Sequence, residues 1–169
     1  QVYTLTAVLS ILALKGKERV SVSTLIHRQH HRRVSQRLLR KAVNETLASE
    51  GVSTRSVEIS IALVDDITIQ SLNAQYRGIN TPTDVLSFSQ EQEISFPGTP
   101  RLLGDVVVSL DTAARQAEQV GHSLDDEVGQ LVIHGVLHLL GYDDVTPEGY
   151  TEMVRKGAEI RQRIQCNTG

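Results

Sequence analysis

The segment IHGVLHLLGYDD, residues 133–144, sets two histidines four positions apart in an otherwise apolar run. Residues i and i+4 of an α-helix lie on one face about one turn apart, so the imidazoles of His134 and His138 can point to a common centre. Helices offer two nitrogen ligands to zinc with this spacing. The segment therefore predicts a helix that carries a metal site, although two core histidines with hydrogen-bond partners would give the same pattern.

Glycines and aspartates in the same segment favour the metal site. Gly135 lies between the histidines, where glycine costs a helix about 1 kcal/mol, so we expect another backbone or a substrate to come close there. Gly141 ends the helix, and the chain can then turn back to present Asp143 or Asp144 to the same centre. Zinc peptidases carry a glutamate base directly after the first histidine, so glycine at position 135 argues against proteolysis.

Outward from this helix, strand patterns and helix patterns alternate along the chain. Residues 57–64 place apolar side chains at every second position and are the clearest strand. The other expected strands are 20–26, 85–89 and 102–110, and the expected helices are 34–49, 66–76, 111–120, 124–140 and a last helix that starts at Pro147. We predict an α+β fold in a single domain, with a small mixed β-sheet of about four strands flanked by helices, in which the metal-site helix ends at Gly141.

Composition is that of one soluble domain. The chain has 169 residues, of which 40% are hydrophobic and 22% charged. A single cysteine, Cys166, excludes an internal disulfide and favours a reducing, cytoplasmic setting. The apolar run at residues 2–14 is too short to span a bilayer, which needs about 20 residues, so we expect no membrane association through a spanning segment. We expect residues 19–166 to form the domain and residues 1–18 to be an extension of unknown role.

Positive charge is concentrated in the first quarter of the chain. Residues 1–41 contain nine basic residues and one acidic residue, while the whole chain has a net charge of −3. A basic segment on an acidic body suggests a polyanionic partner such as RNA, and a solvated helix face with a basic bias is the plainer alternative. The candidate RNA-binding residues are Arg32, Arg33, Arg37, Arg40 and Lys41.

Three motifs resemble one family. HGVLHLLGYDD, LNAQYRGINTPTDVLSF (residues 72–88) and LLGDVVVS (residues 102–109) are similar, in order and spacing, to the motifs of the YbeY-type rRNA maturation endoribonucleases. The resemblance implies a small mixed sheet flanked by helices, one Zn²⁺ ion per chain, and action on ribosomal RNA ends and in ribosome quality control. It also implies that His134 and His138 are metal ligands and that Arg77 is the functional arginine of the family.

The chain departs from the family at the third ligand. The family has a histidine six residues after the second one, and this chain has Asp144 there. A carboxylate is an acceptable zinc ligand, but aspartate is shorter than histidine, so the loop after Gly141 must come closer to the metal. Two histidines and a carboxylate also suit Fe(II), so another divalent metal is possible. Asp143 or His122 as the third ligand, and a weakened or empty site, remain as alternatives.

The sequence thus predicts a metal-dependent endoribonuclease that matures rRNA, including the 16S rRNA 3′ end, with the ribosome or its proteins as partners. Arg77 is expected to hold the phosphate, because a guanidinium matches phosphate geometry in two-point contact. The alternatives are a ribosome-binding or RNA-binding assembly factor with a degenerate metal site and no catalysis, and a metal-dependent hydrolase of another substrate.

Overall fold

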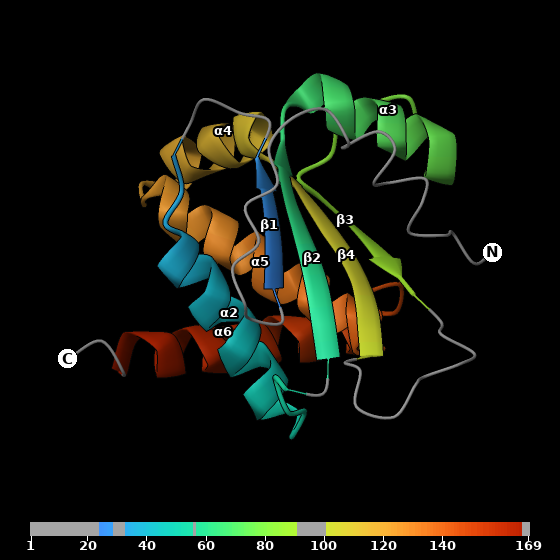
Figure 1. Ribbon diagram of the computed structural model, residues 1–169. Coiled ribbons are helices and arrows are strands. Elements are labelled where there is room, and N and C mark those ends of the chain that lie inside the picture. The colour runs from blue at the N-terminus through green and yellow to red at the C-terminus, as the bar shows by residue number, and fades with distance from the viewer. Residues whose placement is uncertain (1–23, 29–32, 56, 91–100, 167–169) are drawn as a thin grey trace.

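A four-stranded mixed sheet lies at the centre of the computed structural model, which describes residues 24–28, 33–55, 57–90 and 101–166 (Figure 1). The strand order is β1 (Thr24–Arg28), β2 (Val57–Val64), β4 (Arg101–Ser109) and β3 (Val85–Ser89). The first three are parallel, and β3 runs antiparallel to β4 at the edge of the sheet. The predicted α+β fold with a small mixed sheet is confirmed.

Five helices surround the sheet among the described residues: α2 (Gln36–Ser49), α3 (Asp66–Arg77), α4 (Leu110–Val120), α5 (Leu124–Leu139) and α6 (Pro147–Cys166). The side chains of Ser35, Asp65, Ser109 and Ser123 each accept a hydrogen bond from the backbone N–H three residues later, so they cap α2 to α5. The cap of α4 lies two residues before Asp111, where the sequence pattern places the start of that helix. Small polar caps thus fix where these helices begin.

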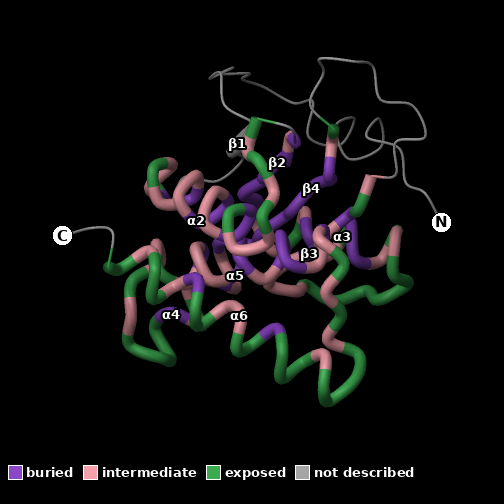
Figure 2. Tube along the Cα trace, turned by 90° about the horizontal axis from the view of Figure 1, so that it is seen from below, coloured by how far each residue is buried: buried purple, intermediate pink, exposed green. Residues whose placement is uncertain are grey.

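The helices divide between the two faces of the sheet. Ile59, Ile61 and Leu63 of β2 pack in the larger core with α2, α5 and α6, while Ala62 and Val64 pack in a smaller core with α3. Figure 2 shows this buried layer between the sheet and its helices. As a result, α3 lies on the opposite face of the sheet from the helix that carries the two histidines.

The glycine between the histidines lets α5 approach the sheet. A Cβ atom at Gly135 would lie 2.6 Å from Cγ1 of Val106 in β4 and 3.1 Å from Oγ of Ser87 in β3. Ser87 also donates a hydrogen bond of 3.0 Å from its Oγ to the carbonyl oxygen of Gly135. The close neighbours of Gly135 are therefore side chains of the sheet, where the sequence suggested a backbone or a substrate.

Parts of the expected organisation lie outside the described residues. These are the extension at residues 1–18 and the first part of the strand expected at residues 20–26. Among the residues that the structure describes, no helix is long and apolar enough to cross a membrane.

Candidate metal centre

Three side chains from the end of α5 and the loop after it converge on one point. Nε2 of His138 lies 3.1 Å from Nε2 of His134, and Oδ2 of Asp144 lies 3.5 Å from Nε2 of His134 and 3.7 Å from Nε2 of His138. All three side chains are about one-third exposed, so solvent can reach the point between them. Among the described residues, this is the one group of three or more His, Cys, Asp or Glu side chains that could hold a metal ion.

The spacing of the three atoms suits a tetrahedral ion. Ligands at about 2.0–2.1 Å from a tetrahedral zinc ion lie about 3.3–3.4 Å from one another, and the three observed separations fall on both sides of that value. Three protein ligands leave a fourth position open, which is the arrangement of catalytic rather than structural zinc sites. The donor set therefore fits a metal ion with an open coordination position.

A backbone carbonyl orients the second histidine. Nδ1 of His138 lies 3.0 Å from the carbonyl oxygen of Tyr142, and because a carbonyl can only accept, Nδ1 carries the proton. Nε2 of a neutral His138 then presents its lone pair toward His134 and Asp144. Metal-bound histidines are held in this way, with the far ring nitrogen donating to a carbonyl or carboxylate.

Burial and the neighbouring histidine disfavour protonation of His134. Burial lowers the pKa of His134, and the neighbouring His138 lowers it further, while the carboxylates of Asp144 and Asp84 act in the opposite direction. A neutral imidazole has a lone pair to offer, whereas a protonated imidazole does not. The environment of His134 therefore favours the form that binds a metal.

The alternative third ligands point elsewhere. Oδ1 of Asp143 accepts a hydrogen bond of 3.0 Å from the backbone N–H of Val145. Nε2 of His122 lies 2.9 Å from Oε2 of Glu127, with which it forms an ion pair when protonated. Neither residue belongs to the group of three, so Asp144 is the carboxylate that completes it.

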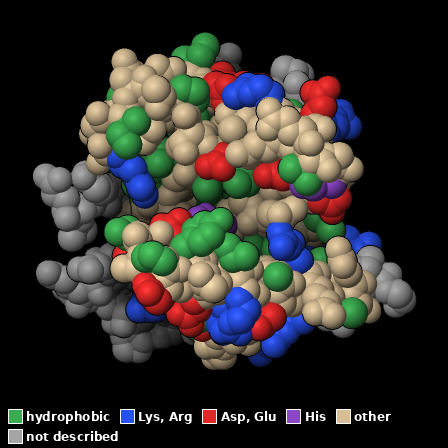
Figure 3. Space-filling model, turned by 180° about the vertical axis from the view of Figure 1, so that it is seen from behind, with side chains coloured by type: hydrophobic (Ala, Val, Ile, Leu, Met, Phe, Trp, Pro, Cys, Tyr) green, Lys and Arg blue, Asp and Glu red, His purple; other side chains and the backbone are tan. Residues whose placement is uncertain are grey.

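A cleft of about 310 Å³ opens beside the centre, between α5 and α6. His134 lines it together with Asp84, Glu127, Tyr150 and Arg161. Burial raises the pKa of Glu127, and the neighbouring carboxylate of Asp84 raises it further. Figure 3 shows the hollow across this face of the molecule, with histidine side chains at its margin and hydrophobic side chains below them. The cleft thus reaches the centre at His134.

Arg77 is not brought into the group of three. It is the last residue of α3, on the other face of the sheet, and its side chain is exposed. The charged groups that act on the pKa of His134 are His138, Asp144 and Asp84, and Arg77 is not one of them. Among the described residues, Arg77 has no ion-pair partner, so its charge is available to a ligand.

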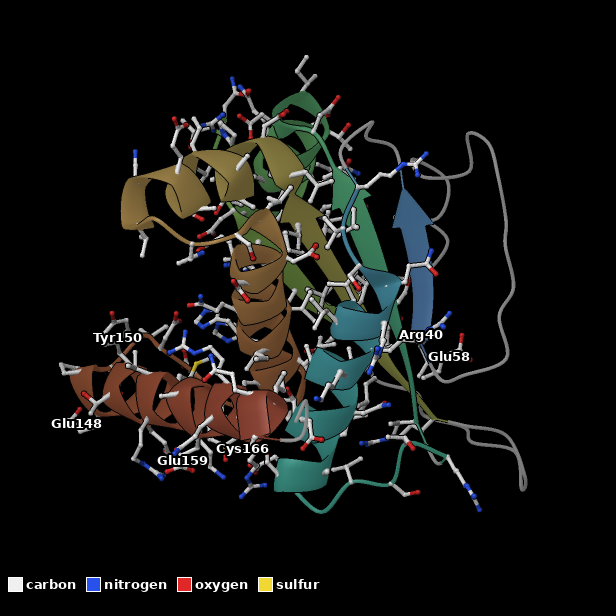
Figure 4. All side chains as sticks on the ribbon, turned by 90° about the vertical axis from the view of Figure 1, so that its left-hand side faces the viewer. Arg40, Glu58, Glu148, Tyr150, Glu159 and Cys166 are labelled. Atoms are coloured by element: carbon white, nitrogen blue, oxygen red, sulfur yellow. The ribbon has the colours of Figure 1, made fainter. Side chains whose placement is uncertain are left out.

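The described basic residues in α2 and just before it do not line the cleft beside the centre. Arg33 and Arg37 are exposed, whereas Arg40 and Lys41 are half-buried, and Nζ of Lys41 donates a hydrogen bond of 2.8 Å to the carbonyl oxygen of Ile164. Figure 4 shows Arg40 on the opposite side of the molecule from Tyr150, which lines the cleft. Arg32 lies outside the described residues.

Comparison with known proteins identifies the family. The family model described as Endoribonuclease YbeY matches residues 24–165. The chain belongs to the YbeY endoribonuclease family. The resemblance of the three motifs is therefore confirmed.

This chain aligns with individual YbeY relatives over most of their length. Endoribonuclease YbeY of Pelotomaculum thermopropionicum is 46% identical over 129 residues, which are 75% of this chain and 84% of the relative. Endoribonuclease YbeY of Desulforamulus reducens is 46% identical over 134 residues, 78% of this chain and 87% of the relative. A solution structure of a Thermotoga maritima protein covers 85% of this chain with a TM-score of 0.54 and 25% identity. The α+β fold of this YbeY-family chain thus has a counterpart among solved structures.

Sequence reasoning missed the residues that hold the return loop, which we define as residues 140–145. The hydroxyl of Tyr142 donates to Oε2 of Glu50, which is 92 residues away in sequence, and Lys156 donates to the same carboxylate. Tyr142 lies inside the quoted motif, but nothing in the sequence pairs it with the end of α2. An alignment showing that positions 50 and 142 vary together would have been the usable signal.

Proposed function

We propose that His134, His138 and Asp144 hold one zinc ion and form the catalytic centre of an endoribonuclease that matures ribosomal RNA. The observation that carries the proposal is the convergence of three ligand atoms within 4.8 Å of one another, in a chain of an endoribonuclease family. The open fourth position and the adjoining cleft supply the remaining requirements of a catalytic site.

The identity of the metal rests on the donor set. Two imidazole nitrogens and one carboxylate oxygen suit zinc, and the same set also holds non-haem Fe(II). We favour zinc because two helix histidines and one further protein ligand, with a fourth position left open, are the arrangement of catalytic zinc sites. A bound zinc ion would polarise a phosphate oxygen of the substrate and lower the pKa of a water molecule to about 7.

Groups of the protein orient a metal ligand and hold the RNA substrate. The carbonyl of Tyr142 keeps the proton of His138 on Nδ1 and so directs Nε2 to the centre. The cleft lined by His134 receives the chain of a single-stranded substrate beside the centre. Arg77 contacts a phosphate of the bound RNA through its exposed guanidinium at the end of α3.

Two exposed basic residues guide the RNA electrostatically, one just before α2 and one in its first turn. Arg33 and Arg37 are exposed and lie outside the cleft, so they serve a long substrate such as a ribosomal RNA rather than its cleaved bond. Partners of this kind, the ribosome and its RNA, place the chain in the cytoplasm.

The test is cleavage of single-stranded RNA by the purified chain with added zinc. His134→Ala should lower the rate at least 100-fold, and Arg77→Ala should weaken cleavage without changing zinc content. His122→Ala is the matched control, because His122 is a half-buried histidine outside the group of three, and it should retain activity within a few-fold. Each variant is checked for folding by circular dichroism.

The outcomes separate the proposal from its rivals. RNA binding that persists without metal, combined with no cleavage after zinc is restored, would identify an assembly factor with a degenerate site. Cleavage of simple phosphodiesters with indifference to RNA would identify a hydrolase of another substrate. Full activity of His134→Ala would refute the assignment of the centre.

A further inference from the structure

Three side chains from different parts of the chain meet behind the return loop. Oε2 of Glu50, at the end of α2, accepts a hydrogen bond of 2.8 Å from the hydroxyl of Tyr142. Oε1 of the same carboxylate accepts a hydrogen bond of 2.5 Å from Nζ of Lys156 in α6. The ammonium of Lys156 also lies 5.8 Å from the centre of the Tyr142 ring. The loop is thereby attached to two helices through one carboxylate.

The attachment is charged and largely shielded from solvent. The side chains of Glu50 and Lys156 are each only 20% exposed. The hydrogen bond from Lys156 is the largest influence on the pKa of Glu50, which it lowers. The same hydrogen bond is the largest influence on the pKa of Lys156, which it raises. Both groups are therefore ionised at neutral pH. Charge-assisted hydrogen bonds of this kind are about twice as strong as neutral ones.

The attached residue is also the one that orients a metal ligand. The carbonyl of Tyr142 accepts the bond from Nδ1 of His138, and Asp144 follows two residues later. Among the described residues, the polar partners of the Asp144 side chain are His134 and His138, so its place depends strongly on the backbone of the loop. A displacement of Tyr142 would therefore disturb two of the three ligands together.

We propose that Glu50 is a positioning residue of the metal centre, which acts by holding the hydroxyl of Tyr142 and thereby fixes His138 and Asp144. This inference rests on the proposed function of the centre. Glu50 contacts neither ligand directly, so its effect reaches the metal through the loop. Removing a group that is hydrogen-bonded directly to a metal ligand typically weakens metal affinity about 10- to 100-fold, and because Glu50 acts one bond further out we expect the lower end of that range.

The decisive variant is Tyr142→Phe, which removes the hydroxyl and keeps the ring and the carbonyl. Zinc affinity is measured by competition with a chromophoric chelator, and the geometry of the site is read from the visible absorption of the Co²⁺-substituted protein. We expect zinc to bind at least 10-fold more weakly and the Co²⁺ spectrum to change. Glu50→Gln removes the charge and leaves one acceptor oxygen for two donors, so it should weaken zinc binding in the same direction. The double variant should show little further loss beyond Tyr142→Phe, because the two residues act as one unit.

Controls separate positioning from general stability. Tyr76→Phe removes a hydroxyl from a tyrosine that packs against the smaller core, on the other face of the sheet, and it should leave zinc affinity within twofold of the parent. Glu148→Gln neutralises an exposed carboxylate at the start of α6 and should also leave it unchanged. All affinities are measured at a temperature where thermal unfolding with chelator shows every variant to be folded. A purely structural role would lower the melting temperature without changing the affinity or the spectrum of the folded protein.

Asp144→Ala distinguishes failure of this inference from failure of the centre itself. If Asp144→Ala loses zinc while both Tyr142→Phe and Glu50→Gln bind it as the parent does, Glu50 is not a positioning residue. If Asp144→Ala binds zinc normally, the proposed centre is wrong, and the role of Glu50 is overturned with it.

Discussion

The contact between α5 and the sheet makes Gly135→Ala a quantitative test of the packing. The added methyl group would lie 2.6 Å from Cγ1 of Val106, whose side chain is completely buried, and 3.1 Å from Oγ of Ser87. Carbon atoms in contact prefer about 3.5–4.0 Å, so the added methyl group and the Val106 side chain must separate by about 0.9 Å or more. The same helix contains Gly129, around which an added Cβ would meet no atom within 4 Å.

The expected change in free energy of unfolding follows from comparing Gly135→Ala with Gly129→Ala. Alanine is more favourable than glycine within a helix by about 1 kcal/mol, which Gly129→Ala should gain in full. Gly135→Ala receives the same gain but also the overpacking cost of about 1–3 kcal/mol. Because the helix term cancels, the two variants should differ by about 1–3 kcal/mol in free energy of unfolding. For a chain of this length each kcal/mol shifts the melting temperature by about 2–4 °C.

Urea unfolding with chelator present measures both variants without a contribution from metal. Gly135→Ala should also weaken zinc binding, because His134 precedes it directly and moves with the helix. Equal stabilisation by both substitutions would refute the reasoning, since it would mean that α5 and the sheet can move apart at Val106 without a loss of folding free energy.

Three further predictions concern charge and metal. Asp144→Ala should lower the zinc content found by elemental analysis, and unchanged content would point to another third ligand. Burial raises the pKa of Glu127 above its ordinary value of 4.5. The contribution of Glu127 to the stability of the fold is therefore most favourable below pH 4.5, where the carboxyl group is protonated, and it declines as the pH rises through the raised pKa. Glu127→Gln should therefore increase the melting temperature relative to the parent at pH 7 and show a smaller increase near pH 4; a difference independent of pH would contradict this. Replacing Arg33 and Arg37 by Gln should weaken RNA binding and flatten its salt dependence by about 0.7 in logarithmic slope per lost phosphate contact, and an unchanged slope would exclude them from the RNA interface.

Local signals account for the elements that the sequence predicted well. The strands at residues 57–64 and 85–89 have the predicted bounds, because alternation and flanking polar residues mark both ends. The start of α5 follows from Ser123, whose side chain caps the helix, and its end follows from Gly141, which adopts a positive φ of 97°. Such signals act over a few residues and can be read without the rest of the fold.

Relations between distant segments could not be read in that way. Periodicity ends a helix at Tyr76, one residue before Arg77, but does not tell which face of the sheet that helix covers, so the placement of α3 opposite the helix of the two histidines was not foreseen. Gly135 signalled a close approach, yet only the register of β3 against β4 brings Ser87 and Val106 to it. The partnership of Glu50 with Tyr142 likewise depends on packing across 92 residues.

The hydrogen bond between Lys156 and Glu50, the residue that holds the return loop, has a consequence for the order in which the fold forms. Glu50 and Lys156 are separated by 106 residues, and contacts of such long range form late, since much of the chain must already be arranged before they close. During synthesis the nascent protein would emerge with both histidines made but with its last helix still missing. The carboxylate of Glu50 thus gains its charged partner only when α6 has packed against the end of α2, so a chain lacking this helix would keep both histidines but lose one of the two hydrogen bonds to Glu50.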